Sequence, residues 1–432
     1  MKNGKRIIAL AATAALAVAG LTACSSNGGK QTITVWAMQG QTGEVNAAKQ
    51  EVAAFNKANP DIKATLKFVP DMGTALKTTK ADALPDAFEF DGETLASLVY
   101  AGKLAKLNGL VADSSIKNEL ASIQAEGTYS DGNTYSVSQY DSGLTLWGNK
   151  SLLAKAGVSD VPTTVDKAWT ADQFTGVLSK IAAVTPGHKA ITFKENYNIG
   201  GGWAGYAFSP IVNSAGEPLV KDGKAVGSMD APAVAAAFKT FASWKQYSDP
   251  DADDSAFQTK RVALAWIGHW ATPAITSSLG ADAELIPLPN FGNGTKSGQG
   301  SHSWAIGAKS AHQQAAAKFL EFITQDSWIN NVTNQNGAVP ATNTALAANA
   351  NYAPGGLLAL YAAQLNKSCG SANPTASCVT VPRTISPAWP FINTTFSAAV
   401  QSIWDGADPQ AALTKAATAI DQDYADNGEY KK

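Results

Sequence analysis

Side chains that hold metal ions are scarce in the 432-residue sequence, which has three cysteines and four histidines. The histidines are scattered and have no cysteine or carboxylate at the spacing of metal ligands, so we expect no metal site. An excess of either charge is also missing. The formal net charge of −2 argues against nucleic acid or an anionic lipid surface as a partner.

Common enzyme signatures are missing too: we find no G-x-S-x-G, no Walker A loop and no H-E-x-x-H. Residues 200–205 match G-x-G-x-x-G formally, but the strand-turn-helix context and the later acidic residue of a dinucleotide site are absent. The acids Asp249, Asp251, Asp253 and Asp254 lack the turn glycine and final glutamate of a calcium loop, and predict a solvated acidic turn. We therefore expect no cofactor.

Beyond the N-terminal segment, no run approaches the ~18 apolar residues that a membrane-spanning helix needs. The N-terminus itself has three basic residues followed by the uncharged run 7–19, the layout of a secretory signal. It ends in Leu-Thr-Ala-Cys24, which resembles the lipobox of bacterial lipoproteins. This implies a signal peptide at residues 1–23, a lipid (diacylglycerol and a fatty acyl chain such as palmitate) on Cys24, and a flexible tether at 24–30. An ordinary cleaved signal that contains a cysteine is the alternative.

Two further cysteines, Cys369 and Cys378, bracket a loop rich in Gly, Ser, Asn and Pro. Because secreted proteins occupy an oxidising environment, we expect a local disulfide between them. A metal site made from two isolated cysteines is the weaker alternative.

Strands and helices alternate along the chain, which predicts an α/β fold with a parallel sheet. Residues 32–37 and 61–69 read as strands, and residues 41–59 between them carry apolar side chains at helical spacing. Later segments continue the alternation: a strand at 85–90 and helices at 93–101, 315–324 and 409–424. A chain of this length favours two domains over one core.

Short motifs in a fixed order resemble the family 1 extracellular solute-binding proteins of carbohydrate ABC importers, relatives of maltose-binding protein. The resemblance covers residues 30–425, with departures such as Arg261, where the family pattern has glycine. Its motifs are T-V-W at 34–36, N-P at 59–60, P-D-A-F-E-F-D-G at 85–92, A-G-K-L at 101–104, N-K-S-L-L-A-K-A-G at 149–157, G-H-W at 268–270, P-L-P at 287–289, G-A-V-P-A at 337–341 and P-R at 382–383.

The resemblance implies a two-lobed fold of the periplasmic-binding-protein type, with discontinuous lobes, a hinge and a ligand cleft between them. We expect the first lobe at 31–142 and 270–325 and the second at 143–269 and 326–432. It also implies that the chain is no enzyme, and that it binds an oligosaccharide and delivers it to an ABC permease. We expect a monomer held by its lipid on the extracellular side of the membrane, in keeping with a Gram-positive cell.

Candidate ligand-binding residues are aromatic side chains for sugar-ring faces and polar side chains for hydroxyls. Trp36, Trp169, Trp244 and Trp404 lie inside periodic runs and are assigned to core packing. The candidates are Trp270, Asp91, Trp203, Trp389, Tyr140, Asp141, Gln39, Glu44, Glu89, His302 and Trp304.

Two alternatives to oligosaccharide binding stay open. One is a protein of the same fold that binds another solute, such as a peptide. The other is a secreted glycosidase, because Glu89, Asp91 and Glu93 lie close together and glycosidases use paired carboxylates.

Overall fold

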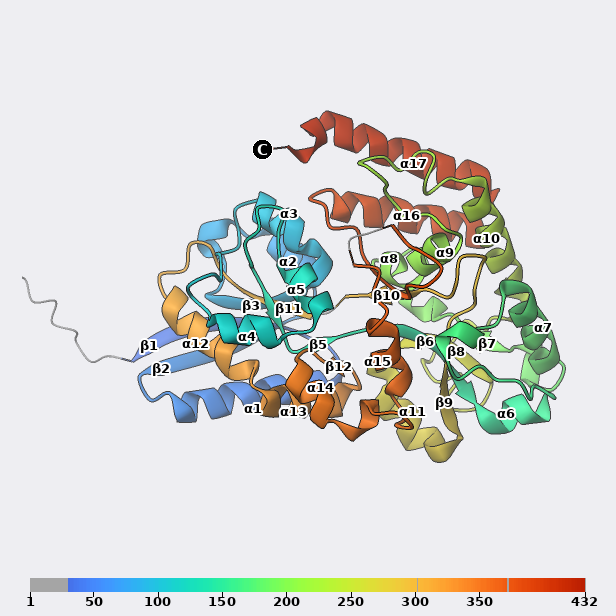
Figure 1. Ribbon diagram of the computed structural model, residues 1–432, viewed down its shortest axis with the longest axis horizontal. Helices are drawn as coiled ribbons and strands as arrows, with labels where there is room; N and C mark the ends of the chain where they lie inside the picture. The colour runs from blue at the N-terminus through green and yellow to red at the C-terminus, as the bar shows by residue number, and fades with distance from the viewer. Residues whose placement is uncertain (1–29, 301, 371–372, 432) are drawn as a thin grey trace, which may run out of the picture.

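The computed structural model describes residues 30–300, 302–370 and 373–431 (Figure 1). The expected signal peptide, Cys24 and nearly all of the expected tether lie outside these residues. Within the described part of the chain, no helix has the length and apolarity needed to cross a membrane.

The first lobe is built on a five-stranded sheet of order β2-β1-β3-β11-β4. β1 pairs in parallel with β2 and β3, whereas β11 runs antiparallel to β3 and β4. β3 is central and almost entirely buried, as expected for a strand covered on both faces. The strands are β1 (Gln31–Met38), β2 (Ile62–Val69), β3 (Ala87–Asp91), β4 (Val137–Ser138) and β11 (His302–Ile306).

Helices cover both faces of this sheet. On one face, Val52 and Phe55 of α1 (Thr42–Ala58) and Phe319 of α12 (Gln313–Ile323) join one apolar core. The other face carries α2 (Met72–Thr78) and α3 (Leu95–Tyr100). The expected β-α-β opening is confirmed, because the helical spacing of apolar residues in α1 matches its buried face. The expected helix at 93–101 is in fact a 3-10 turn (Gly92–Thr94) followed by α3.

The second lobe has a four-stranded sheet of order β7-β8-β6-β9. β6 runs antiparallel to β8 and β9, and β7 is parallel to β8. The strands are β6 (Leu144–Asn149), β7 (Ile191–Thr192), β8 (Leu264–Gly268) and β9 (Ala283–Ile286). Helices cover both faces of this sheet. One face carries α7 (Ala171–Ala182), α8 (Ala204–Ala207), α9 (Ser209–Ser214), α10 (Pro232–Ser243), α16 (Trp389–Trp404) and α17 (Pro409–Asp426). The other face carries α11 (Thr272–Leu279) and α15 (Ala359–Leu365).

The two lobes lie side by side, and α17 extends from the second lobe towards α3 of the first (Figure 1). Between the two large sheets, β5 (Tyr140–Asp141) pairs antiparallel with β12 (Val339–Pro340). A second small sheet joins β10 (Ser297–Gln299) to β13 (Thr380–Pro382), close to β6. The chain therefore passes between the lobes at several places.

Sheet membership differs from the expected lobe boundaries in two segments. β9 falls within the expected first-lobe segment 270–325, yet it pairs with β6 of the second sheet. α13 (Asp326–Asn336) begins the expected second-lobe segment, yet it packs on α1 of the first lobe. Its apolar residues Ile329 and Val332 are buried, and Val332 shares a small apolar cluster with Ala47 of α1.

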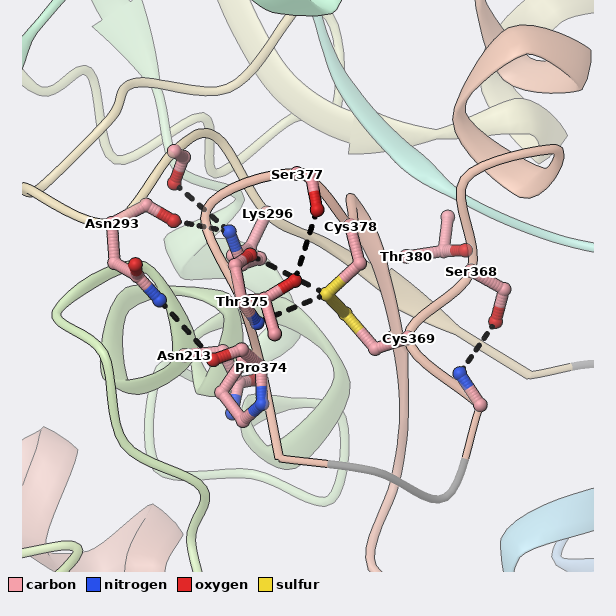
Figure 2. Close-up of a disulfide and its surroundings, with 12 residues drawn as sticks. Asn213, Asn293, Lys296, Ser368, Cys369, Pro374, Thr375, Ser377, Cys378 and Thr380 are labelled. Atoms are coloured by element: carbon pink, nitrogen blue, oxygen red, sulfur yellow. Dashed lines mark hydrogen bonds between the residues drawn. A yellow bond between two sulfur atoms is a disulfide. The ribbon is translucent and has the colours of Figure 1, made fainter.

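The expected disulfide between Cys369 and Cys378 is present (Figure 2). Its loop is fixed to the rest of the lobe by the Asn293 side-chain amide, which donates to the Pro374 carbonyl oxygen at 3.2 Å. The loop leads into β13, so the disulfide stabilises the segment that precedes Arg383.

The acidic turn is not simply solvated, which corrects the expectation for residues 249–254. Asp251 is fully buried, and its carboxylate lies 2.6 Å from the Lys194 Nζ. Arg261 pairs with Asp249 at 3.3 Å and Asp253 at 2.7 Å. The arginine that departs from the family pattern therefore offsets part of the negative charge of this turn.

Candidate functional site

A cavity of about 330 Å³ lies between the two lobes. The first lobe contributes the start of α1, the end of β3 and the start of β11, and the second contributes α8, its preceding loop and the turn after β8. Its walls are Gly40, Gln41, Glu44, Asp91, Glu93, Tyr140, Ser142, Tyr197, Gly202, Trp203, Tyr206, His269, Trp270, Gly300, His302 and Arg383.

Glu44 is held at the first turn of α1 by a capping box. The Gln41 backbone N–H donates to Glu44 Oε2 at 2.9 Å, which turns this carboxylate towards the helix N-terminus. The other oxygen, Oε1, accepts from the Asn336 amide at 3.2 Å and from the Tyr140 hydroxyl at 3.5 Å. The helix N-terminus thus presents a fixed carboxylate to the cavity.

His302 is surrounded by acidic side chains. Its Nδ1 lies 3.0 Å from Glu89 Oε1 and 2.8 Å from the Tyr140 hydroxyl, and its Nε2 lies 3.6 Å from Asp91 Oδ1. Burial lowers the pKa of His302, but the hydrogen bond to Glu89 and the charges of Glu89, Asp91 and Glu44 outweigh it and raise the pKa to about 10. The imidazole is therefore a cation at neutral pH.

His269, unlike His302, is uncharged at neutral pH. It is buried, its Nδ1 lies 3.1 Å from the Asn336 carbonyl oxygen, and burial lowers its pKa to about 4 despite the nearby Glu44. A neutral imidazole that donates from Nδ1 leaves Nε2 as an acceptor.

The second lobe supplies an aromatic wall made of Tyr197, Trp203, Tyr206 and Trp270. The rings of Tyr206 and Trp270 have centroids 6.2 Å apart, and Tyr197 meets Trp203 edge to face at 5.5 Å. Trp270 lies so close over Gly268 that a Cβ there would come within 2.1 Å of the indole ring. The glycine of the G-H-W motif is therefore required for the position of this ring.

Arg383 joins the two lobes at the cavity. Its guanidinium lies over the Tyr206 ring at 5.1 Å and pairs with Glu93, at the end of the first-lobe strand β3, at 2.7 Å. Both side chains are about nine-tenths buried. Burial raises the pKa of Glu93 to about 7, while Arg383 opposes this shift.

A model of the bacterial extracellular solute-binding proteins matches residues 39–329 of the chain. The chain belongs to this family. It is 25% identical over 330 residues to the diacetylchitobiose-binding protein DasA of Streptomyces coelicolor, a match that covers 72% of this chain and 73% of DasA.

Solved structures show the same fold. The GacH receptor of Streptomyces glaucescens, solved unliganded and with acarbose or an acarbose homolog, matches with a TM-score of 0.74 at 19% identity, over 93% of this chain and 100% of GacH. The ABC substrate-binding protein Lmo0181 of Listeria monocytogenes, solved with cycloalternan, matches with a TM-score of 0.75 at 18% identity, over 92% and 99%. The family and the α/β binding-protein fold that the sequence predicts are confirmed.

In this solute-binding protein, the predicted site residues fall into two groups. The structure brings together in the cavity walls Trp270, Asp91, Trp203, Tyr140, Glu44 and His302.

The other predicted residues lie away from these walls. Glu89 lies behind His302, and Gln39 is exposed just before the wall residue Gly40. Asp141 is fully buried, and Trp304 lies beneath His302 on β11, edge to face with Phe319. Trp389 is buried in the second-lobe core because α16 turns its apolar first residue inwards.

Ten of the sixteen wall residues are missing from the candidate set, and five of these ten have ionisable side chains. Three of the five lie within three residues of a predicted residue: Glu93 after Asp91, Tyr206 after Trp203 and His269 before Trp270. The other two come from separate segments: Tyr197 precedes the glycine-rich loop, and Arg383 belongs to the P-R motif.

Proposed function

We propose that this protein captures an oligosaccharide in the cleft between its lobes and delivers it to the permease of an ABC importer. The observation that supports the proposal is the different chemistry of the two walls of the cavity. Flat aromatic rings from the second lobe face carboxylates and the His302 imidazole from the first. Sugars need both, because their ring faces are apolar and their hydroxyls need hydrogen-bond partners.

The relatives support a sugar ligand. DasA is named as a diacetylchitobiose-binding protein, and the GacH and Lmo0181 structures contain acarbose and cycloalternan. The cavity volume also lies at the small end of the range typical for ligand sites, which suits a short oligosaccharide.

In this proposal, the lipid on Cys24 holds the protein at the extracellular face of the membrane, and the protein acts as a monomer. Sugar that touches both lobes favours the closed state through the contacts it makes only there. The permease then recognises the closed form. Six predicted side chains form the ligand contacts, together with the five ionisable wall side chains that the prediction missed.

Isothermal titration of the chain from residue 25 onwards against di- to tetrasaccharides tests the proposal. We expect micromolar or tighter binding to one linkage class, with the sugar recovered unchanged. Release of cleaved sugar would contradict a binding role and favour a glycosidase. Absence of binding to every sugar, with a non-carbohydrate found in the purified protein by mass spectrometry, would reject the sugar ligand.

A further inference from the structure

The cleft holds more acidic than basic side chains. Glu44, Asp91 and Glu93 line the cavity, and Glu89 lies directly behind His302. Within the described part of the chain, the basic side chains that line the cavity and carry charge at neutral pH are His302 and Arg383, because burial keeps His269 neutral.

These two cations are already engaged. Arg383 is paired with Glu93 at 2.7 Å, and its guanidinium also lies over the Tyr206 ring. His302 carries one positive charge but stands between two carboxylates, 3.0 Å from Glu89 and 3.6 Å from Asp91. One of these two negative charges is left over.

Glu44 adds a second uncompensated charge, since its carboxylate accepts hydrogen bonds from the neutral donors Gln41 N–H, Asn336 and Tyr140. The nearby Lys194 does not offset it, because its ammonium pairs with Asp251 at 2.6 Å and also with Asp254. The cleft therefore carries more negative than positive charge.

The negative charge of the cleft raises the pKa values of other groups in it. Burial raises the pKa of the Tyr140 hydroxyl, and the charges of Glu44, Glu89 and Asp91 raise it further. The same three carboxylates hold the proton on His302. The first-lobe wall is thus a region of negative potential that faces the aromatic wall of the second lobe.

Closure of the lobes over a neutral sugar would remove these carboxylates from water without supplying an opposite charge, which is costly. A ligand with a cationic group offsets that cost and gains attraction to both walls, because aromatic faces also attract cations. We propose that the ligand is a cationic amino sugar, an oligosaccharide with a free ammonium group placed between Glu44 and Asp91. This inference rests on the proposed function and names its substrate class.

Three β-1,4-linked trisaccharides that differ only at carbon 2 test the inference: the trimers of glucose, N-acetylglucosamine and glucosamine. They carry a hydroxyl, a neutral amide and a protonated amine at pH 6. We expect titration calorimetry at low salt to show the glucosamine trimer binding about tenfold or more tightly than either neutral trimer. The advantage should shrink as sodium chloride is raised, since salt screens the partly exposed Asp91.

Two charge-neutralising variants locate the ammonium. Glu44→Gln and Asp91→Asn should each reduce the preference for the amino sugar to within about threefold of the neutral trimers. The matched control is Asp172→Asn, which removes one exposed carboxylate on α7 outside the cavity and should leave the preference unchanged.

The outcomes separate the two proposals. Equal binding of the three trimers, or tighter binding of any neutral sugar in the wider panel, would overturn the amino-sugar inference while the proposed function stands. Failure of every charged and neutral sugar to bind would overturn both. Preference for the amino trimer that survives Glu44→Gln and Asp91→Asn would also reject the placement between these carboxylates.

Discussion

At the scale of single residues, Trp270 is the side chain on which the proposed stacking depends most. Its ring is fixed by Gly268 beneath it, Tyr206 at 6.2 Å and His269 at 5.5 Å, so little rotamer freedom remains to be lost when a sugar binds. We expect Trp270→Ala to weaken binding of the sugar by about tenfold to a hundredfold, because the aromatic face on which the sugar stacks is removed. Titration calorimetry measures this loss.

Trp328→Ala is the matched control for this prediction. Trp328 is also partly buried, on α13, where its ring lies 5.5 Å from Phe322 outside the cavity. It should leave the affinity unchanged. An unaltered affinity in Trp270→Ala would mean that this ring only packs between the lobes.

Some of the cavity could be predicted from the sequence because its residues follow strand ends or belong to recognisable motifs. Asp91 ends β3, and Trp270 lies in the G-H-W motif after β8. The sequence pattern could not distinguish the buried Trp389 from these cavity residues, since a tryptophan after a proline gives the same pattern whether its helix faces a cleft or a core. Tyr206 and Arg383 meet only through folding, because 177 residues separate them in the chain.

At the scale of elements, α1 carries a buried acid that controls how tightly the helix is held at different pH values. Glu51 is 2% exposed, and its Oε1 accepts from the Gln139 amide at 2.6 Å. Burial raises the pKa of Glu51 from 4.5 to about 8, against the hydrogen bond from Gln139. The folded protein therefore keeps a proton that the unfolded chain releases, so the stabilisation present below pH 4.5 is lost as the pH rises through 8.

Glu51→Gln removes this titration but keeps an oxygen that can accept from Gln139. At pH 8 we expect the variant to be more stable than the parent protein by about 4 kcal/mol, with little difference at pH 4.5. Urea unfolding at both pH values measures the difference, with the exposed Asp172→Asn as control. A constant difference between parent and variant across this range would show that Glu51 is ionised in the fold.

Elements were most predictable where one apolar face decides the structure. The spacing of Val52 and Phe55 in α1 and of Phe319 and Ile323 in α12 predicts both helices, and both faces are buried in one core. The sequence pattern does not show to which lobe an element belongs. α13 shows an amphipathic pattern of its own, but its contact with α1 arises only when segments almost 300 residues apart come together.

At the scale of the whole molecule, two contacts join the lobes at the rim of the cleft. One is the Arg383–Glu93 ion pair, and the other is the edge-to-face contact between Tyr100 of α3 and Tyr430 after α17, with centroids 5.5 Å apart. The tyrosine contact agrees with the way α17 extends towards α3 (Figure 1). Neither contact includes a ligand, so both hold the lobes together in the arrangement of this structure without one.

This arrangement predicts how the balance between open and closed forms responds to mutation. Glu93→Gln removes the carboxylate that pairs with the buried Arg383 across the lobes, so we expect the ligand-free variant to populate a more open form with a larger radius of gyration in small-angle X-ray scattering. Saturating ligand should restore the compact form, and the affinity should fall by about tenfold because binding must now close the cleft unaided. Asp405→Asn is the control, since it removes the Lys245–Asp405 pair on the surface of one lobe, at 3.1 Å, without touching the other lobe. If Glu93→Gln lowered the affinity with no change in the ligand-free radius, the ion pair would shape the site locally and the lobes would close without its help.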